Sequence, residues 1–358
     1  MNFSFYDLVD VRLEPSLRSL GKYFEQEFGA FRKPADKPPK SIIEFRPLSP
    51  NEGPSAGFDA SVGGMMYKRG DVYYINDGRD RYAEWIEPQA GGDHVVIRID
   101  PQFKPYRAYY YVVLPLLKLF FNRNGCTFIH SAAVEMDGKR YALCGWGGTG
   151  KTNTLLRLIE RGAVYLSDDL TVVDRQGNLY PFPRSINVYH YNLEGVPGLA
   201  RRMTRRQRMR ARIASIGGAL ASSILPRHRY FVTIAQKKLS GSSIPSSWVN
   251  AGSQSVAGKP AAVVALLYSG APRSSPASVE CTETEDIAAA CLANIMYEFQ
   301  SIQALYSMYG FLAGARPAVM VGGEDFAIIR EFLANSRIAK VSVPPGHAFE
   351  PVDLLQLG

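Results

Sequence analysis

Cysteine is scarce in this sequence, and the residues present form no motif. The 358 residues include four cysteines, none in a CxxC pair, and they lie mostly among apolar neighbours as small core residues do. Structural disulfide bonds are therefore not expected, and a reducing cytoplasm fits this composition. The first residues also lack a basic leader followed by an apolar stretch, so we expect no secretory signal.

Long apolar runs and paired metal ligands are missing as well. The most apolar stretch, 109–121, contains Pro115 and Lys118 and is too short to cross a bilayer, so we interpret it as a buried helix and expect no membrane span. Repeats and low-complexity tracts are absent. A permanent zinc site is not expected either, because four histidines lack ligand partners three or four positions away: His94, His190, His228 and His347.

Apolar and basic residues are abundant by contrast. Hydrophobic residues make up 46% of the chain, enough to bury one large core or two modest ones. The net charge of +8 favours acidic partners such as nucleotides, phosphorylated substrates or acidic peptides.

Arginines concentrate between 201 and 212. Such a stretch could bind an acidic peptide or protein, a nucleic acid or an anionic lipid, and a solvated helix face is the commoner role. Nucleic acid is disfavoured, because no aromatic residues lie between these arginines to stack on bases.

The first part of the chain, 1–105, is predicted to be a β-rich accessory region. Apolar residues at helical spacing predict one amphipathic helix between Pro15 and Gly29, followed by a Pro- and Lys-rich linker at 33–40. We expect a small antiparallel sheet with a turn at Arg69-Gly70-Asp71 and strands at 41–45, 65–68, 72–76 and 94–99.

The remainder, 106–358, is predicted to be a catalytic α/β domain with a mixed sheet, interrupted by a basic insertion at about 199–230. After a helix at 109–122, strands are expected at 127–136, 140–144, 163–166, 170–174, 179–182, 261–268 and 338–343. A capping box at Thr282-x-x-Glu285 predicts a long helix to about Tyr309, and another helix is expected at 324–333.

One motif indicates specific chemistry, the P-loop pattern G-x-x-x-x-G-K-T at Gly145–Thr152. It follows an apolar strand and precedes a helix, which is the context that phosphate binding requires. Lys151 is predicted to reach the β- and γ-phosphates of ATP, and Thr152 to bind Mg²⁺. A purely structural glycine-rich turn is the alternative. Backbone groups of the same segment are predicted to surround the phosphates, at Gly145, Gly147, Gly148, Thr149, Gly150 and Asn153.

Two adjacent acids, Asp168 and Asp169, end the apolar strand after the P-loop helix. They are expected at the sheet edge where ligands bind in open α/β sheets. One carboxylate can hold Mg²⁺ while the other accepts the proton of an attacking hydroxyl, so the pair favours a kinase; a solvated turn is the alternative. Arg184 follows closely and is a candidate phosphate clamp, with a surface arginine as the alternative.

Three segments resemble the HPr kinase/phosphorylase family, whose P-loop core is shared with ATP-dependent phosphoenolpyruvate carboxykinases: Phe128–Val134, Gly145–Thr152 and Arg161–Asp169. The resemblance implies His130 near the γ-phosphate, Asp168 as general base, Asp169 as metal ligand and a homo-oligomer. Without the family, His130 on an apolar strand would more often be a core residue.

This resemblance covers about 127–173, and the acidic, glycine-containing segment found downstream in HPr kinase proper has no counterpart. The layout is more similar to divergent HPr-kinase-like proteins, some of which phosphorylate a hydroxyl of a ribosomal peptide, such as a lasso-peptide precursor, or of a small molecule.

The sequence therefore predicts a cytoplasmic kinase that passes the γ-phosphoryl group of Mg·ATP to a Ser-like hydroxyl of a peptide, protein or small molecule. A nucleotide-sensing P-loop module that docks a partner without phosphoryl transfer is the alternative. ATP hydrolysis coupled to conformational work is weaker, because no arginine-finger pattern is recognisable. The acceptor's identity and the number of subunits stay open at this stage, as does the existence of reverse phosphorolysis.

Overall fold

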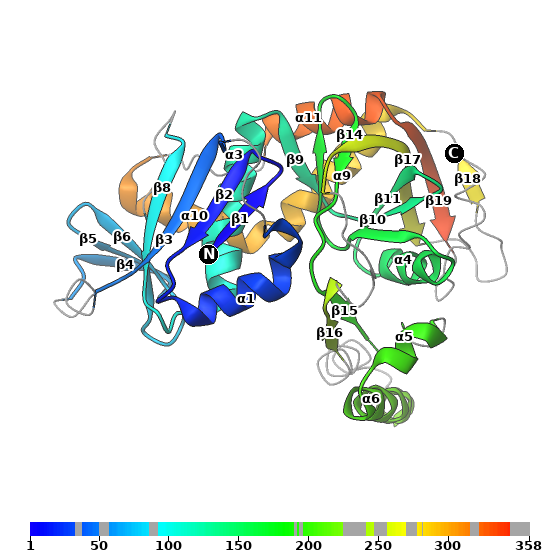
Figure 1. Ribbon diagram of the computed structural model, residues 1–358, viewed down its shortest axis with the longest axis horizontal. Helices are drawn as coiled ribbons and strands as arrows, with labels where there is room; N and C mark the ends of the chain where they lie inside the picture. The colour runs from blue at the N-terminus through cyan, green and yellow to red at the C-terminus, as the bar shows by residue number, and fades with distance from the viewer. Residues whose placement is uncertain are drawn as a thin grey trace.

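Two mixed β-sheets with helices on their faces form the body of the molecule (Figure 1). The computed structural model describes residues 1–32, 38–49, 57–85, 92–189, 192, 196–224, 241–246, 256–269, 278–280, 282–315 and 322–343. The mixed α/β class is as predicted, and the described strands form no closed barrel. None of the described helices is long and apolar enough to cross a bilayer.

The first sheet has eight strands in the order β1-β2-β3-β8-β7-β6-β5-β4. Their bounds are β1 (Asn2–Phe5), β2 (Val9–Leu13), β3 (Ser41–Pro47), β4 (Ala60–Val62), β5 (Met66–Arg69), β6 (Val72–Asn76), β7 (Tyr82–Trp85) and β8 (His94–Ile99). The four predicted strands are confirmed, and Gly70 makes the predicted turn at φ +57°.

The expectation of a purely antiparallel sheet is wrong, because β3 runs parallel to both β2 and β8. Parallel neighbours need a long crossover connection, and α1 (Arg18–Phe28) provides it between β2 and β3. This helix is the predicted one, and it buries Leu20, Phe24 and Phe28. The predicted linker at 33–40 lies mostly outside the described residues.

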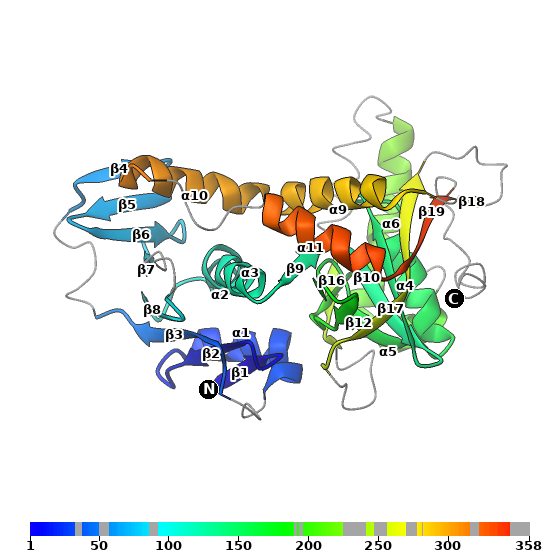
Figure 2. The same cartoon turned by 90° about the horizontal axis from the view of Figure 1, so that it is seen from above.

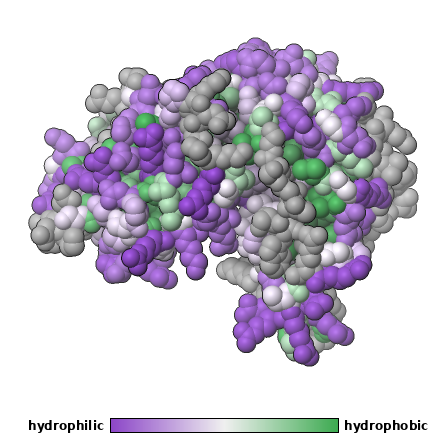
Figure 3. Space-filling view, viewed as in Figure 1, coloured by the Kyte–Doolittle hydropathy of each residue, from purple (hydrophilic) through white to green (hydrophobic). Residues whose placement is uncertain are grey.

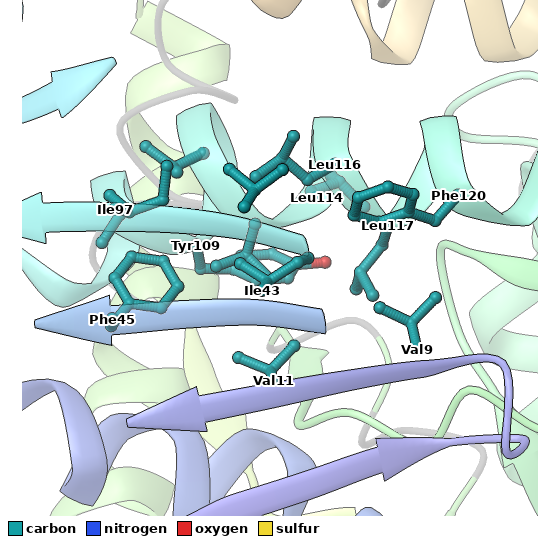
Figure 4. Close-up of a cluster of buried hydrophobic side chains, with 14 of the residues drawn as sticks. Val9, Val11, Ile43, Phe45, Ile97, Tyr109, Leu114, Leu116, Leu117 and Phe120 are labelled. Atoms are coloured by element: carbon teal, nitrogen blue, oxygen red, sulfur yellow. The ribbon is translucent and has the colours of Figure 1, made fainter. Parts of the chain in front are cut away.

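A helical segment covers the sheet face shown in Figure 4, where Leu117 and Phe120 lie close to Val9 and Ile43. It consists of α2 (Pro105–Ala108), a π-helical turn η3 (Tyr109–Val113) and α3 (Leu114–Arg123), which confirms the buried helix predicted at 109–122.

The second sheet carries the glycine-rich segment and has β17 (Lys259–Ser269) at its centre. This strand runs parallel to β11 (Lys139–Gly145) and β19 (Arg337–Val343), and antiparallel to β14 (Asn178–Tyr180). The remaining strands are β9 (Cys126–Ile129), β10 (Ser131–Met136), β12 (Val164–Ser167), β13 (Thr171–Asp174) and β18 (Ser278–Glu280).

Helices cover both faces of this sheet. Helix α4 (Lys151–Glu160) packs with Leu143 on one face, whereas α9 (Thr284–Glu298) and α11 (Gly323–Ala334) pack with Cys144 on the other. Successive side chains of a strand point to opposite faces of the sheet. The continuous apolar run in β11 therefore contributes side chains to the apolar core on each face.

Two predicted elements are interrupted in the structure. The strand expected at 127–136 is divided at His130, because β9 pairs with β13 whereas β10 pairs with β11 and β12. The helix expected to run to Tyr309 is divided at Phe299 into α9 and α10 (Gln300–Ala313). The expected capping box at 282–285 is also wrong, because α9 starts after Glu283 with no side-chain cap.

Helix α10 leaves the second sheet and covers the first (Figure 2). The Tyr309 ring lies 4.8 Å from the Tyr73 ring, and the Tyr306 ring lies 4.9 Å from that of Trp85. Residues near the end of the chain therefore complete the core of the N-terminal sheet.

A smaller arm extends from the body below α4 in Figure 1. It contains α5 (Pro197–Arg202), α6 (Arg205–Ile224) and a two-stranded ladder of β15 (Ile186–Val188) and β16 (Ser242–Ile244). The described part of the predicted basic insertion is helical except at Met203 and Thr204, which separate α5 from α6, and its residues 225–230 lie outside the described ones.

A buried ion pair joins the helical layers of the two sheets. The carboxylate of Asp325, 1% exposed, accepts hydrogen bonds from Lys118 Nζ at 3.0 Å, Thr127 Oγ1 at 2.6 Å and Asn122 Nδ2 at 3.0 Å. Burial alone would raise the pKa of Asp325, but Lys118 and these donors outweigh it and hold the pKa below its usual value. The charge is compensated only while every partner is in place.

Asp325→Ala should therefore lower the free energy of unfolding by about 3–5 kcal/mol, because Lys118 is left as an uncompensated buried charge. Urea denaturation followed by circular dichroism measures this loss. The control is Glu324→Ala, which removes an exposed carboxylate paired with Arg175 and should cost at most about 1 kcal/mol. Equal losses in the two variants would contradict the role of Asp325.

Candidate functional site

The glycine-rich loop, Gly145–Gly150, joins the end of β11 to the start of α4. Gly145, Gly148 and Gly150 have φ angles of +147°, +89° and +93°, which L side chains rarely adopt. A Cβ at Gly145 would also lie 2.7 Å from the carbonyl oxygen of Leu267 and 2.9 Å from Thr149 Oγ1. The loop can therefore curl against β17 only because glycine stands at its start.

Lys151 lies across this loop. Its Nζ donates to the carbonyl oxygens of Gly145 at 2.5 Å and Trp146 at 3.1 Å, and the side chain is 7% exposed. Burial lowers the pKa of Lys151, while the charges of Asp168 and Asp169 oppose that shift. The ammonium group is thus held by backbone carbonyl oxygens of the loop, which the oxygens of an anion could replace.

Thr152 and the two acids follow at the same sheet edge. Thr152 Oγ1 donates to the carboxylate of Asp168 at 3.2 and 3.3 Å, and Asp168 is only 6% exposed. Burial and the charge of Asp169 raise the pKa of Asp168 to about 8, although Lys151 and Thr152 act in the opposite direction. Asp169 itself is exposed, in a left-handed conformation at φ +71°.

His130 lies between β9 and β10, near these groups. Its Nε2 is 3.7 Å from Glu298 Oε1, and its Nδ1 is buried without a hydrogen-bond partner. Burial, together with the charge of Lys151, lowers the pKa of His130 to about 3, so the imidazole is neutral at pH 7. The structure thus places His130, Lys151 and the acid pair in one neighbourhood.

The last turns of α9 provide residues that the sequence analysis missed. Asn294 Nδ2 donates to the Gly145 carbonyl at 2.7 Å, and the Tyr297 ring lies 4.6 Å from that of Trp146. Burial and the charge of Asp169 raise the pKa of Glu298. The available signal was the spacing of Asn294 and Glu298, two polar residues four apart in the part of α9 that follows its acidic first turn and is otherwise apolar.

Arg184 contacts the N-terminal region rather than the loop. Its Nε lies 3.5 Å from Glu27 Oε2, and its guanidinium lies 4.3 Å from the centre of the Tyr109 ring. The side chain is 21% exposed, and its charge also interacts with Asp169. Arg184 is therefore not an ordinary surface arginine, and it lies between α1 and the acid pair.

Asn153, the last residue predicted to contact the nucleotide, lies in the first turn of α4. Its Oδ1 accepts a hydrogen bond from Asn192 Nδ2 at 2.5 Å. The Asn153 side chain thus connects α4 to Asn192. The Asn153 backbone lies in the first turn of α4.

Mg²⁺ fits the donor set at this edge. No cluster of three or more His, Cys, Asp and Glu side chains within the described ranges could hold a metal ion. Mg²⁺ does not need one, because it keeps several waters and binds through one or two carboxylates together with substrate phosphates. The hydroxyl of Thr152 beside the carboxylate of Asp168 provides such a partial set of hard oxygen ligands.

Comparisons with known proteins return no match to this chain, either among family models or among curated proteins.

Gly145→Ala should displace the loop from β17, because the added methyl group meets the backbone of Leu267. We expect a loss of about 1–3 kcal/mol in the free energy of unfolding, measured with urea. Gly147→Ala is the matched control, since nothing lies within 4 Å of a Cβ there and its φ is not positive. A Gly145 variant as stable as the Gly147 variant would show that the close approach is not needed.

Asp168 should also make stability depend on pH. Its folded-state pKa of about 8 exceeds the ordinary 3.8, so the folded protein keeps a proton that the unfolded chain releases. That contribution to stability is complete below about pH 4 and is lost as the pH rises to about 8. Asp168→Asn should therefore gain stability relative to wild type between about pH 5 and about pH 8, measured by urea denaturation. A constant difference between the two proteins would refute this assignment.

Proposed function

We propose that this protein is an ATP-dependent kinase with a P-loop core of the HPr kinase type, which transfers the γ-phosphoryl group to a hydroxyl of its acceptor. The observation that supports this most directly is the contact between Thr152 and the buried carboxylate of Asp168, 3.2 Å apart, at the end of the glycine-rich loop. A loop for phosphates, a lysine and a pair of acids at one sheet edge are the parts that phosphoryl transfer requires.

The phosphates of ATP would bind the backbone N–H groups of the loop and the N-terminus of α4, where the helix dipole favours negative charge. Lys151 would exchange the carbonyl oxygens of Gly145 and Trp146 for phosphate oxygens. Thr152 and the acid pair would hold Mg²⁺, which neutralises charge on the phosphates when bound. Positioning and charge neutralisation supply most of the catalysis in such reactions.

The acid pair would divide two roles, metal ligand and general base. The raised pKa of Asp168 supports it as the base, since a base works best when its pKa is near the operating pH. Its contact with Thr152 supports the metal role instead. Asp169 takes the complementary role in either case, and its exposed position allows it to meet an incoming acceptor.

The acceptor would approach beside Trp146 and Tyr297. Lys151 contacts the carbonyl of Trp146, so this side of the loop corresponds to the γ-phosphate end. The two rings, which contact each other at a tilt of 39°, are about half exposed, at 49% and 54%, and Glu298 lies next to them with His130. Aromatic faces beside carboxylates suit a hydroxyl-bearing peptide, protein or small molecule.

A nucleotide-sensing module without phosphoryl transfer is the second candidate, and one contact favours it. Asn294 joins the Gly145 carbonyl to α9, and α9 leads through Phe299 into α10 on the N-terminal sheet. A conformational change of the loop could therefore be transmitted through α9 and α10 to a docking surface far from the loop. Nucleotide binding without any phosphorylated product would support this candidate.

The decisive experiment follows label from γ-labelled ATP with Mg²⁺ into fractionated extract of the native host. Wild type should label a discrete species, and Lys151→Ala should lower the rate at least about 100-fold, because the cation facing the transferred group is lost. Lys22→Ala, an exposed lysine on α1, is the control and should retain full activity. A fully active Lys151→Ala variant would overturn the proposal.

The same assay separates the roles of the acids. A variant of the metal ligand should need more Mg²⁺ for half-maximal activity, whereas a variant of the base should stay slow at saturating Mg²⁺. Asp168→Asn and Asp169→Asn are compared over a Mg²⁺ titration.

A further inference from the structure

Helix α6 exposes a line of apolar side chains that no described part of the protein covers. Met209, Ile213 and Ile216 are 62%, 53% and 61% exposed. Their spacing of four and then three residues places them on one face of the helix. Large apolar side chains aligned in this way on a surface mark an interaction site more often than isolated ones do. We call this line the α6 stripe.

Arginines flank the α6 stripe on both sides. At 100° per residue, Arg205 and Arg212 fall on one flank of Met209, and Arg206 and Arg210 fall on the other. All four are exposed, and none forms an ion pair with another residue that the structure describes. Helices α5 and α6 contain no acidic residue, so the arm itself does not neutralise this charge.

The position of α6 leaves the stripe accessible. The helix lies at the far end of the arm, away from both sheets, and its surface in Figure 3 combines hydrophilic residues with a smaller hydrophobic area. The apolar cluster around α4 extends to Met203 of the arm and does not include the stripe.

We infer that α6 binds the surface of an anionic membrane, lying flat with the α6 stripe inserted and its arginines on the lipid headgroups. Arginine side chains can extend from both flanks of a helix to headgroups while their carbon stems cover apolar surface. A flat lipid surface accepts a convex apolar line without a shaped groove, whereas a protein partner would need an apolar groove with two acidic rims. A second copy of α6 would bring like charges together.

The inference is independent of the proposed kinase activity, because it uses no residue of the loop or the acid pair. Lys151→Ala should therefore bind membranes as wild type does, even though its rate of phosphoryl transfer should be at least about 100-fold lower. Failure of membrane binding and failure of phosphoryl transfer can thus be distinguished.

The test is co-sedimentation of the full chain with vesicles of phosphatidylcholine, with and without phosphatidylserine. Wild type should bind only the anionic vesicles and should be released at about 0.5 M salt, because the arginine contacts are screened. Replacing the stripe by serine, with Met209→Ser, Ile213→Ser and Ile216→Ser together, should weaken partitioning at least about tenfold.

Removing charge tests the flanks. Arg206→Gln with Arg210→Gln should weaken partitioning roughly 30-fold, because each arginine near an anionic surface contributes to attraction. The control variant carries Arg18→Gln and Arg337→Gln, two substitutions at exposed positions outside the arm. It changes the net charge by the same amount as the flank variant and should weaken partitioning much less. Circular dichroism checks that every variant remains folded.

Three results would overturn the inference. Wild type could fail to bind anionic vesicles. The stripe variant could bind anionic vesicles as well as wild type does, and polyglutamate could displace the protein fully from the vesicles. Together these results would indicate a surface for acidic polymers. Sedimentation velocity could instead show a dimer that the stripe variant loses, which would assign the stripe to a second copy of the chain.

Discussion

The carbonyl oxygen of Gly145 is the point on which the candidate site depends. It accepts hydrogen bonds from Lys151 Nζ and from Asn294 Nδ2, so the strand end, the lysine and α9 meet at one atom. That arrangement is possible because Gly145 has no side chain and its backbone can approach Leu267 on β17. A larger residue would separate the strand end from the elements that hold it, and an unsatisfied buried carbonyl would follow.

From this atom the contacts continue into the N-terminal sheet. Helix α9 presents Glu298 to His130 and stops at Phe299, after which α10 packs on the first sheet. Arg184 also lies 3.5 Å from Glu27 of α1, and its charge interacts with that of Asp169. The N-terminal region thus contacts the site through α9–α10 and through Arg184. It could therefore change the positions of the site residues, although it contributes neither the loop nor the lysine nor the acids.

Elements that depend on local spacing could be predicted from the sequence, whereas contacts between distant segments could not. Helix α1 and strands β3, β6 and β8 were predicted because alternation and helical spacing are local consequences of burying one face. The parallel pairing of β3 was missed, because pairing depends on distant segments. The breaks at His130 and Phe299 were missed for the same reason, because each break lies where the chain changes the distant segments that it packs against.

The sequence by itself determined the glycine-rich loop, its lysine and the acid pair, since each of these features is a set of residue types at a spacing encoded within one short segment of the chain. Only the tertiary structure decided that Asn294, Tyr297 and Glu298 join them from a helix about 150 residues later, and that Arg184 contacts Glu27. Their placement depends on how α9 and α1 pack against the sheets. Packing of that kind follows from the whole set of buried surfaces and not from any one segment of the chain.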